Sequence, residues 1–562
     1  MTLVVQLVIF IALVSYQIIN KTNASLLDVR NLDEDDLIVT LLKPPSRIRG
    51  HILKSRLGQD FYAFQDIPYA KAPTGKNRFK PAIALEGWQE ILDVTSNKKI
   101  CSQPNLTSPI DSLIETEDCL VVNVYTPVKP STNSSLPVYF WIHGGGFTVG
   151  HGAINTYDPK NYMDFGVVVV TINYRLGVLG FLSTDDENIP GNLGLKDQQF
   201  ALKWTYDNIK AFGGDPKQIT IGGESAGGSS VSYHLLHTGN KDMIKGVIQE
   251  SGSALNTFAY QINCRENAFA YAKLLDPTFT SNNSQDLLEL LQKTPVETLI
   301  ETQSNMHSDE LLGFMNGDYW KPIIESGSSI DAYVTGPMQE NFMKGNFLRV
   351  PSLIGFNSEE SLLFLLAMAE DKYEKSVQQF DEHPELMISK KLNVIEEEVK
   401  DVVQDWKKIY TEVPFAQNKA AFVKYNSDAG YIHPTTRQAQ LTSQFVPVYM
   451  YQFAYGKPFL NISGTEHVGH GEELMYLWNI TFLPGVIDEQ FRSTLMTFWT
   501  NFIKNQNPTP FHDGSIMWPE VEPKKLQYLN INETLEIRTN PRNFLEVKET
   551  RDRCIIEPYT IY

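Results

Sequence analysis

The run Ile-Thr-Ile-Gly-Gly-Glu-Ser-Ala-Gly-Gly at residues 219–228 constrains the fold more than any other stretch of the chain. It carries the pattern Gly-x-Ser-x-Gly around Ser225, with a β-branched run before it and a helix-competent run after it. A serine in that context is typical of a nucleophile elbow, a strand-to-helix turn that holds the hydroxyl at the edge of a sheet. Glycines are favoured at both flanks because the turn is strained and a Cβ there would meet neighbouring backbone. Taken alone, the pattern also fits an ordinary glycine-rich turn before a helix.

Strand-like and helix-like segments alternate through the middle of the chain. The apolar and β-branched runs predict strands at 136–142, 167–173, 219–221, 246–250, 349–355 and 445–453, and the pattern at 194–212 predicts a helix. Strands separated by helices imply an α/β fold whose large, mostly parallel sheet is covered by helices on both faces. Ligand sites in such sheets lie beyond the carboxyl ends of the strands.

No tract of linker composition or internal repeat divides the chain, so we expect one domain over residues 25–562. The segments 260–350 and 362–440 are predicted as helix-rich insertions around the entrance of the site. A net charge of −18 argues against nucleic acid and anionic membrane surfaces as partners.

The first residues favour export from the cell. Residues 3–16 are almost wholly apolar but too short for a confident membrane span, which predicts a signal peptide over 1–24 with an uncleaved anchor as the alternative. The last residues, 557–562, contain no apolar span, so no membrane anchor is expected there. We expect a secreted, extracellular glycoprotein. Candidate N-glycosylation sequons begin at Asn23, Asn105, Asn133, Asn282, Asn461, Asn479 and Asn532.

The chain has four cysteines, which allow three pairings in an oxidising compartment. Cys101 and Cys119 enclose a short polar segment that contains a sequon, which favours a disulfide between them. Cys264 and Cys554 could pair with each other or stay free.

A serine nucleophile needs donors for the oxyanion that forms when it attacks a carbonyl. The run Trp-Ile-His-Gly-Gly-Gly-Phe at 141–147 follows an apolar strand and matches a known oxyanion-loop pattern. The backbone N–H groups of Gly145 and Gly146, with that of Ala226 after the serine, are the predicted oxyanion hole. A flexible turn is the simpler interpretation of the triple glycine on its own.

The serine also needs a base and a carboxylate that orients the base. His467 and His470 both lie in a loop after a predicted strand, and His470 is preferred because the residues after it set up a helix start. A metal site at these two histidines lacks a third ligand of suitable spacing, and no metal or cofactor is expected. Glu359 and Glu360 follow the strand predicted at 349–355. The order Ser225, Glu360, His470 matches the Ser…Asp/Glu…His order of α/β hydrolases.

With these residues assembled, the chain resembles the type-B carboxylesterase family, which includes cholinesterases and insect carboxyl- and juvenile hormone esterases. The resemblance covers about residues 60–507. It includes the motifs Glu-Asp-Cys-Leu-Val-Val-Asn-Val-Tyr at 117–125, Asn-Tyr-Arg-Leu-Gly at 173–177, Gly-Asn-Leu-Gly-Leu-Lys-Asp-Gln-Gln at 191–199 and Phe-Gly-Gly-Asp-Pro at 212–216.

The resemblance implies an α/β-hydrolase fold with Ser225 as nucleophile, His470 as base and Glu360 as orienting acid. It places Glu360 above Glu359 because Glu360 lies five residues after Gly355, although Ser361 stands where the family usually has glycine. It also implies a Cys101–Cys119 disulfide and structural ion pairs Arg78–Glu117 and Arg175–Asp197. Glu224 is either a stabiliser of the charged imidazole or a buried, hydrogen-bonded acid.

The resemblance favours a secreted carboxylesterase acting through an acyl-enzyme on small, neutral, largely apolar esters. Cholinesterases carry a tryptophan between the first two cysteines to face a quaternary ammonium, whereas residues 102–118 contain no aromatic. Juvenile hormone esterases usually have glutamine where this chain has Glu224; that activity remains an alternative. The second class is a non-catalytic, cholinesterase-like interaction protein, which the presence of all the site residues disfavours. The sequence leaves the oligomeric state open.

Overall fold

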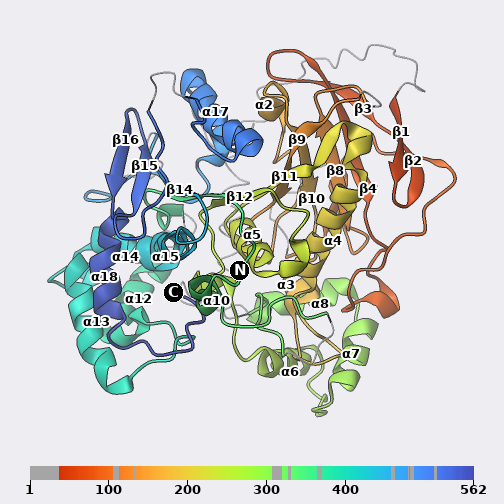
Figure 1. The fold of residues 1–562 in the computed structure, drawn as a ribbon. Coiled ribbons are helices and arrows are strands. Elements are labelled where there is room, and N and C mark those ends of the chain that lie inside the picture. The colour runs from red at the N-terminus through yellow and green to blue at the C-terminus, as the bar shows by residue number, and fades with distance from the viewer. Residues whose placement is uncertain are drawn as a thin grey trace.

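The computed structural model describes residues 37–104, 113–130, 133–306, 319–326, 331–363, 370–456, 462–478, 480, 487–511 and 516–562 (Figure 1). The predicted signal peptide, 1–24, lies outside the described residues, as do the sequons at Asn23, Asn105, Asn461 and Asn479. No helix within the described ranges is long and apolar enough to cross a membrane.

An 11-stranded sheet forms the centre of the molecule, in the order β16-β15-β14-β13-β12-β11-β9-β10-β8-β4-β3. From β15 through β14, β13, β12, β11 and β9 to β10, every neighbouring pair is parallel, and the strands outside this block pair antiparallel. The sheet's strands are β3 (His51–Lys54), β4 (Asp60–Pro68), β8 (Val121–Thr126), β9 (Leu136–Ile142), β10 (Val168–Ile172), β11 (Gly214–Glu224), β12 (Gly246–Glu250), β13 (Ser352–Asn357), β14 (Val448–Phe453), β15 (Gln527–Ile531) and β16 (Leu535–Thr539).

Two smaller sheets lie outside the central one. Strands β1 (Ile38–Leu42), β2 (Pro45–Arg49) and β5 (Ile91–Asp93) form one, and β6 (Lys99–Cys101) and β7 (Ile114–Thr116) form the other. Strand β6 of the second sheet ends at Cys101, one of the two cysteines of the predicted disulfide.

Side chains of one strand alternate between two hydrophobic cores, because successive residues of a strand point to opposite faces. On β9, Phe140 and Ile142 pack into the core that includes residues of α4 and α5. Tyr139 and Trp141 pack into the other core, which includes residues of α2 and α17. The middle of the sheet is therefore buried on both faces, which is why a strand such as β9 is a continuous apolar run rather than an alternating one.

The helices cover both faces and form the two insertions (Figure 1). The longest, α17, begins after Asp488, whose side chain accepts a hydrogen bond from the Phe491 N–H and so caps the helix. The α-helices are α2 (Lys160–Met163), α3 (Gly177–Phe181), α4 (Leu193–Asn208), α5 (Ala226–Leu236), α6 (Cys264–Leu275), α7 (Ser284–Lys293), α8 (Val296–Met306), α10 (Met338–Lys344), α12 (Glu370–Glu382), α13 (Glu396–Tyr410), α14 (Lys419–Ser427), α15 (His433–Thr442), α16 (Leu474–Leu477), α17 (Glu489–Asn505) and α18 (Phe544–Arg551).

Several element boundaries differ from the predicted ones. Strands β9 and β12 have the predicted bounds, but β11 begins at Gly214 rather than 219, across a shift in its pairing with β9. The polar run Asp-Pro-Lys-Gln at 215–218 gave no apolar signal for that extension. Strands β13 and β14 each begin three residues later than predicted. The predicted helix at 194–212 is α4 followed by a 3-10 turn, Ile209–Phe212.

Candidate active site

Ser225 lies in the turn between β11 and α5. Its backbone has φ 59° and ψ −122°, a conformation that is costly for a residue with a Cβ. The Ser225 N–H donates to the carbonyl oxygen of Glu250 at 2.8 Å, which ties the turn to the neighbouring strand β12. A Cβ added at Gly227 would lie 2.0 Å from the carbonyl oxygen of Ile142, and one at Gly223 would lie 2.5 Å from the backbone of Gly227. The two flanking glycines are therefore sterically required.

His470 follows the loop after β14, and Glu360 follows β13. The Nδ1 of His470 lies 2.7 Å from Oε2 of Glu360, in hydrogen-bond contact. The other oxygen of Glu360 accepts from the Ser251 hydroxyl at 2.6 Å and from the Asn357 N–H at 2.7 Å. The carboxylate is fully buried, and its two oxygens have distinct partners, so its orientation toward His470 is firmly set.

Glu359 points elsewhere. Its carboxylate forms an ion pair with Arg542 at 2.6 Å and accepts from the Glu466 N–H at 3.1 Å. The structure thus separates two adjacent glutamates that the loop sequence alone leaves as alternatives. Of the two histidines, His467 is exposed and His470 is buried.

A second carboxylate reaches His470 from the elbow itself. Oε1 of Glu224 lies 3.0 Å from Nε2 of His470, on the opposite side of the ring from Glu360. Burial works to lower the pKa of His470, but the charges of Glu224 and Glu360 outweigh it and raise that pKa above its usual value. Burial raises the pKa of Glu224 to about 7, a shift that His470 opposes and Glu360 increases.

The glycine loop at 144–146 lies against the elbow. A Cβ added at Gly144 would lie 3.0 Å from Cβ of Ser225 and 2.7 Å from Oε2 of Glu224. Gly145, Gly146 and Phe147 all have positive φ, at 109°, 60° and 60°. Ala226 is the first residue of α5, and the first N–H groups of a helix have no partner within it.

Each insertion contributes a residue to this region. The ring of Tyr431, from the segment before α15, lies 4.6 Å from the ring of His470, centroid to centroid. From the other insertion, Nζ of Lys321 donates to the carbonyl oxygen of Gly146 at 2.5 Å. Neither residue was a sequence candidate, and neither lies in a motif that could have indicated it.

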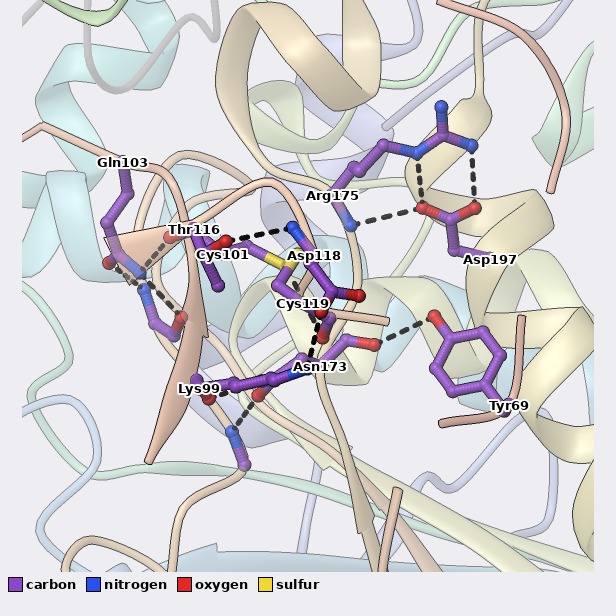
Figure 2. The surroundings of a disulfide bond; sticks show 12 residues. Tyr69, Lys99, Cys101, Gln103, Thr116, Asp118, Cys119, Asn173, Arg175 and Asp197 are labelled. Atoms are coloured by element: carbon purple, nitrogen blue, oxygen red, sulfur yellow. Dashed lines mark hydrogen bonds and ion pairs between the residues drawn. A yellow bond between two sulfur atoms is a disulfide. The ribbon is translucent and has the colours of Figure 1, made fainter. Parts of the chain in front are cut away.

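Cys101 and Cys119 form a disulfide, as predicted, and both are buried (Figure 2). Beside it, Nε and Nη2 of Arg175 donate to the two carboxylate oxygens of Asp197, each at 2.7 Å. The Arg78–Glu117 pair is also present, at 2.6 Å. Each of these four charged side chains belongs to one of the two ion pairs, which fits a structural role rather than a catalytic one. Cys264 and Cys554 are free.

Three predicted glycosylation sites lie within the described part of the chain. Asn133 and Asn282 are exposed, and Asn532 is half-buried at the turn between β15 and β16. Among the described residues, no group of three or more His, Cys, Asp or Glu side chains is arranged to hold a metal ion.

Comparison with known proteins identifies the family to which the chain belongs. The model of the Carboxylesterase family matches residues 35–546, beyond both ends of the resemblance noted in the sequence. The chain is 30% identical over 518 residues to "Juvenile hormone esterase" of Tribolium castaneum, covering 86% of each chain. It is 31% identical over 517 residues to "Carboxylic ester hydrolase" of Bombus ignitus, covering 88% of this chain and 90% of the relative.

The fold is also that of a solved esterase. A crystal structure of juvenile hormone esterase from Manduca sexta, with OTFP covalently attached, superposes with a TM-score of 0.79 at 24% identity. The match covers 92% of this chain and 99% of that one, and at this identity it speaks to the fold alone. The mostly parallel sheet with helices on both faces is thus an α/β-hydrolase fold, and the chain belongs to the carboxylesterase family of ester hydrolases.

Proposed function

We propose that this protein is a secreted serine carboxylesterase that hydrolyses small, neutral, largely apolar esters through an acyl-enzyme on Ser225. Its family supplies the reaction class. The observation that carries the site assignment is the 2.7 Å contact between His470 and Glu360, with the same imidazole reaching the elbow at Glu224.

In the proposed mechanism, Ser225 attacks the ester carbonyl while Nε2 of His470 takes the hydroxyl proton. Glu360 holds the imidazole with its proton on Nδ1, so that Nε2 is available as the base. The N–H groups of Gly145, Gly146 and Ala226 donate to the oxyanion. The alcohol leaves with the proton from His470, and water then repeats the sequence on the acyl-enzyme. Each oxyanion donor typically contributes about 3–4 kcal/mol to lowering the barrier.

Glu224 has a place in the same cycle. When the proton reaches Nε2, the ring becomes positively charged between two carboxylates. That charge is more stable beside Glu224 than it would be beside a neutral amide, because the site is buried and poorly screened. We assign Glu224 the role of stabilising the imidazolium that forms in the transition state.

The substrate class rests on what the chain offers to bind. The segment enclosed by the disulfide, 102–118, has no aromatic side chain for a quaternary ammonium. Juvenile hormone is the second candidate substrate, because the relatives from Tribolium castaneum and Manduca sexta bear that name. Glu224 in place of the usual glutamine weighs against it.

Secretion is supported by two features. The Cys101–Cys119 disulfide fits an oxidising compartment, and the sequon residues Asn133 and Asn282 are exposed enough to carry glycans. Expression of the full chain in insect cells should release it into the medium with its new N-terminus near residue 25. A mobility shift on removal of N-glycans is expected; retention of the leader on cell-bound protein would contradict the proposal.

The decisive test of function is labelling. The purified protein should hydrolyse p-nitrophenyl acetate and lose activity in proportion to one organophosphate adduct, which mass spectrometry should find on Ser225. An adduct elsewhere that abolishes activity, or no turnover by folded protein, would overturn the assignment. A panel of short aliphatic esters, juvenile hormone and acetylcholine should rank the aliphatic esters first and acetylcholine last.

A further inference from the structure

Lys321 is a buried lysine that the mechanism above leaves without a role. Only 5% of it is exposed, and its ammonium group donates to the carbonyl oxygen of Gly146. A buried charge is costly to the folded state unless it is well bonded. Lys321 bonds the very loop that carries two of the proposed oxyanion donors, which makes it a candidate for positioning that loop.

The glycine loop is held almost entirely through its carbonyl groups. The hydroxyl of Tyr174 donates to the carbonyl oxygen of His143. Nδ1 of the His143 ring contacts the carbonyl oxygen of Gly144. The N–H groups of Thr148 and Val149 donate to the carbonyl oxygen of Gly145. The carbonyl oxygen of Phe147 accepts from the Gly177 N–H at 2.8 Å.

The carbonyl of Gly146 has a different kind of partner. It accepts from the ammonium of Lys321 and, at 3.2 Å, from the hydroxyl of Thr148. Lys321 is the one charged side chain among the donors just described for residues 143–147. Charge-assisted hydrogen bonds are about twice as strong as neutral ones, so this contact should restrain the loop more than a neutral donor would.

The backbone that carries Lys321 is itself anchored. The side-chain amide of Gln261 donates to the carbonyl oxygen of Lys321 at 2.6 Å and accepts from the Trp320 N–H at 3.1 Å. Two residues on, the Ile323 N–H donates to the side chain of Asn192 at 2.9 Å. Lys321 therefore reaches the loop from a fixed base, and its ammonium can hold the Gly146 carbonyl in place.

We propose that Lys321 is a positioning residue for ester hydrolysis: its ammonium holds the Gly146 carbonyl and so keeps the N–H groups of the glycine loop aimed at the oxyanion. The inference rests on the proposed oxyanion hole. Gly145 and Gly146 have the backbone freedom to rotate their peptide groups, which makes an external restraint valuable. A displacement of about 1 Å at a reacting group can cost on the order of 10²-fold in rate.

The test replaces Lys321 with methionine, which keeps the length and apolar stem but removes the donor. Turnover is counted per Ser225 titrated with organophosphate, so that unfolded protein does not contribute. Lys321→Met should lower kcat by about tenfold to hundredfold with little change in KM, since the donors act mainly in the transition state. Inhibition by a trifluoromethyl ketone, which forms a tetrahedral oxyanion on the serine, should weaken by the same factor as kcat/KM.

The matched control is Lys196→Met. Lys196 is also buried, and its ammonium pairs with Glu325 at 2.5 Å in a contact that does not involve the glycine loop. The Lys196→Met variant should have a lower thermal stability, while kcat per titrated site and inhibition by the ketone should stay unchanged. Thr148→Val, which removes the neutral donor to the same carbonyl, should give a smaller loss than Lys321→Met.

Three results would overturn the proposal: unchanged kcat per site in Lys321→Met, unchanged ketone potency, or equal losses in Lys196→Met. If Lys321→Met does not fold, Lys321→Gln gives the same comparison, and wild-type kcat and ketone potency in that variant would also overturn it. Failure of the proposed function looks different, because wild-type protein would then carry no organophosphate on Ser225.

Discussion

Glu224 and His470 meet at 3.0 Å between Oε1 and Nε2, so the imidazole is held between two carboxylates, with Glu360 on its other nitrogen. Against the effect of burial, these charges raise the pKa of His470. The base must be neutral to accept a proton, so activity should appear as pH rises through this raised pKa. Burial also raises the pKa of Glu224 to about 7, so the acid limb should report the two groups together.

Glu224→Gln should therefore move the acid limb of kcat/KM to lower pH. Removing a negative charge destabilises the imidazolium, which lowers the pKa of His470 and leaves more of the base neutral at a given pH. The maximal kcat should fall, because the imidazolium in the transition state loses the same partner. The measurement is a pH profile of kcat/KM with a neutral ester.

Glu472→Gln serves as the control for that profile. Glu472 is a half-buried acid whose pKa is also raised to about 7 by burial, but its carboxylate accepts from the Gly469 N–H, whereas Glu224 contacts His470. The acid limb of Glu472→Gln should stay close to that of the wild type. A limb that moves upward in Glu224→Gln, or not at all, would contradict the role of Glu224.

The adjacent glutamates Glu360 and Glu359 should respond in opposite ways. Glu360→Gln should lower kcat by about 10⁴-fold, since an amide favours the wrong imidazole tautomer while the fold stays intact. Glu359→Gln should keep kcat per titrated site but lower the free energy of unfolding by about 3 kcal/mol, because Arg542 loses a buried partner. Urea denaturation measures the loss of stability, and kinetics with active-site titration measure the loss of kcat per site. A large loss of kcat in Glu359→Gln with little loss in Glu360→Gln would exchange the roles assigned to the two glutamates.

The two histidines of the loop after β14 provide a second paired test. His470→Ala should remove nearly all turnover, a loss on the order of 10⁴-fold or more in kcat, because Ser225 loses its base. His467→Ala should leave turnover within about twofold and change stability by less than about 0.5 kcal/mol, since His467 is exposed. Steady-state kinetics and thermal unfolding of both variants check this.

The disulfide should contribute stability rather than chemistry. Cys101 and Cys119 are separated by 18 residues, and closing a loop of that size stabilises a fold by about 3 kcal/mol in the chain-entropy account. The double substitution to alanine should lower the free energy of unfolding by about that amount and leave kcat per titrated site unchanged. Cys264→Ala, at a free cysteine, is the control. Equal stability of the double variant and the wild type would contradict the expectation.

Much of the central sheet could be predicted, because a parallel strand that is buried on both faces gives a continuous apolar run in the sequence. β9 is such a run, and its predicted bounds are confirmed. The predicted bounds of β12 are confirmed as well, although its last two residues, Gln249 and Glu250, are polar. The beginning of β11 could not be predicted, because only Gly214 pairs with β9 before the register shift, and the polar residues 215–218 carry no strand pattern. The peripheral strands β15 and β16 were also missed; β16 is half-buried or exposed along its length and has little apolar pattern.

In the candidate site, too, features set by neighbouring residues in the sequence could be predicted, whereas those set by residues far apart in the sequence could not. The turn at Ser225 is encoded by its own glycines, so the sequence displays it. The choice between Glu359 and Glu360 depends on Arg542, which approaches from a separate part of the chain and pairs with Glu359. Tyr431 and Lys321 reach the site from the insertions, and only the packed structure shows which side chains of these long insertions arrive there.

The order of strands in the parallel sheet also determines at which stage of folding esterase activity can appear. Ser225, Glu360 and His470 follow β11, β13 and β14, and β12 lies between β11 and β13. These four strands must therefore be paired before His470 can contact both Glu360 and the elbow residue Glu224. A ribosome-bound chain that ends before β14 holds a complete elbow yet lacks the base. Esterase turnover is therefore a reporter of completed assembly: during refolding, it should recover only after the far half of the sheet has docked. The nascent protein is thereby inert toward the esters of the cell that makes it.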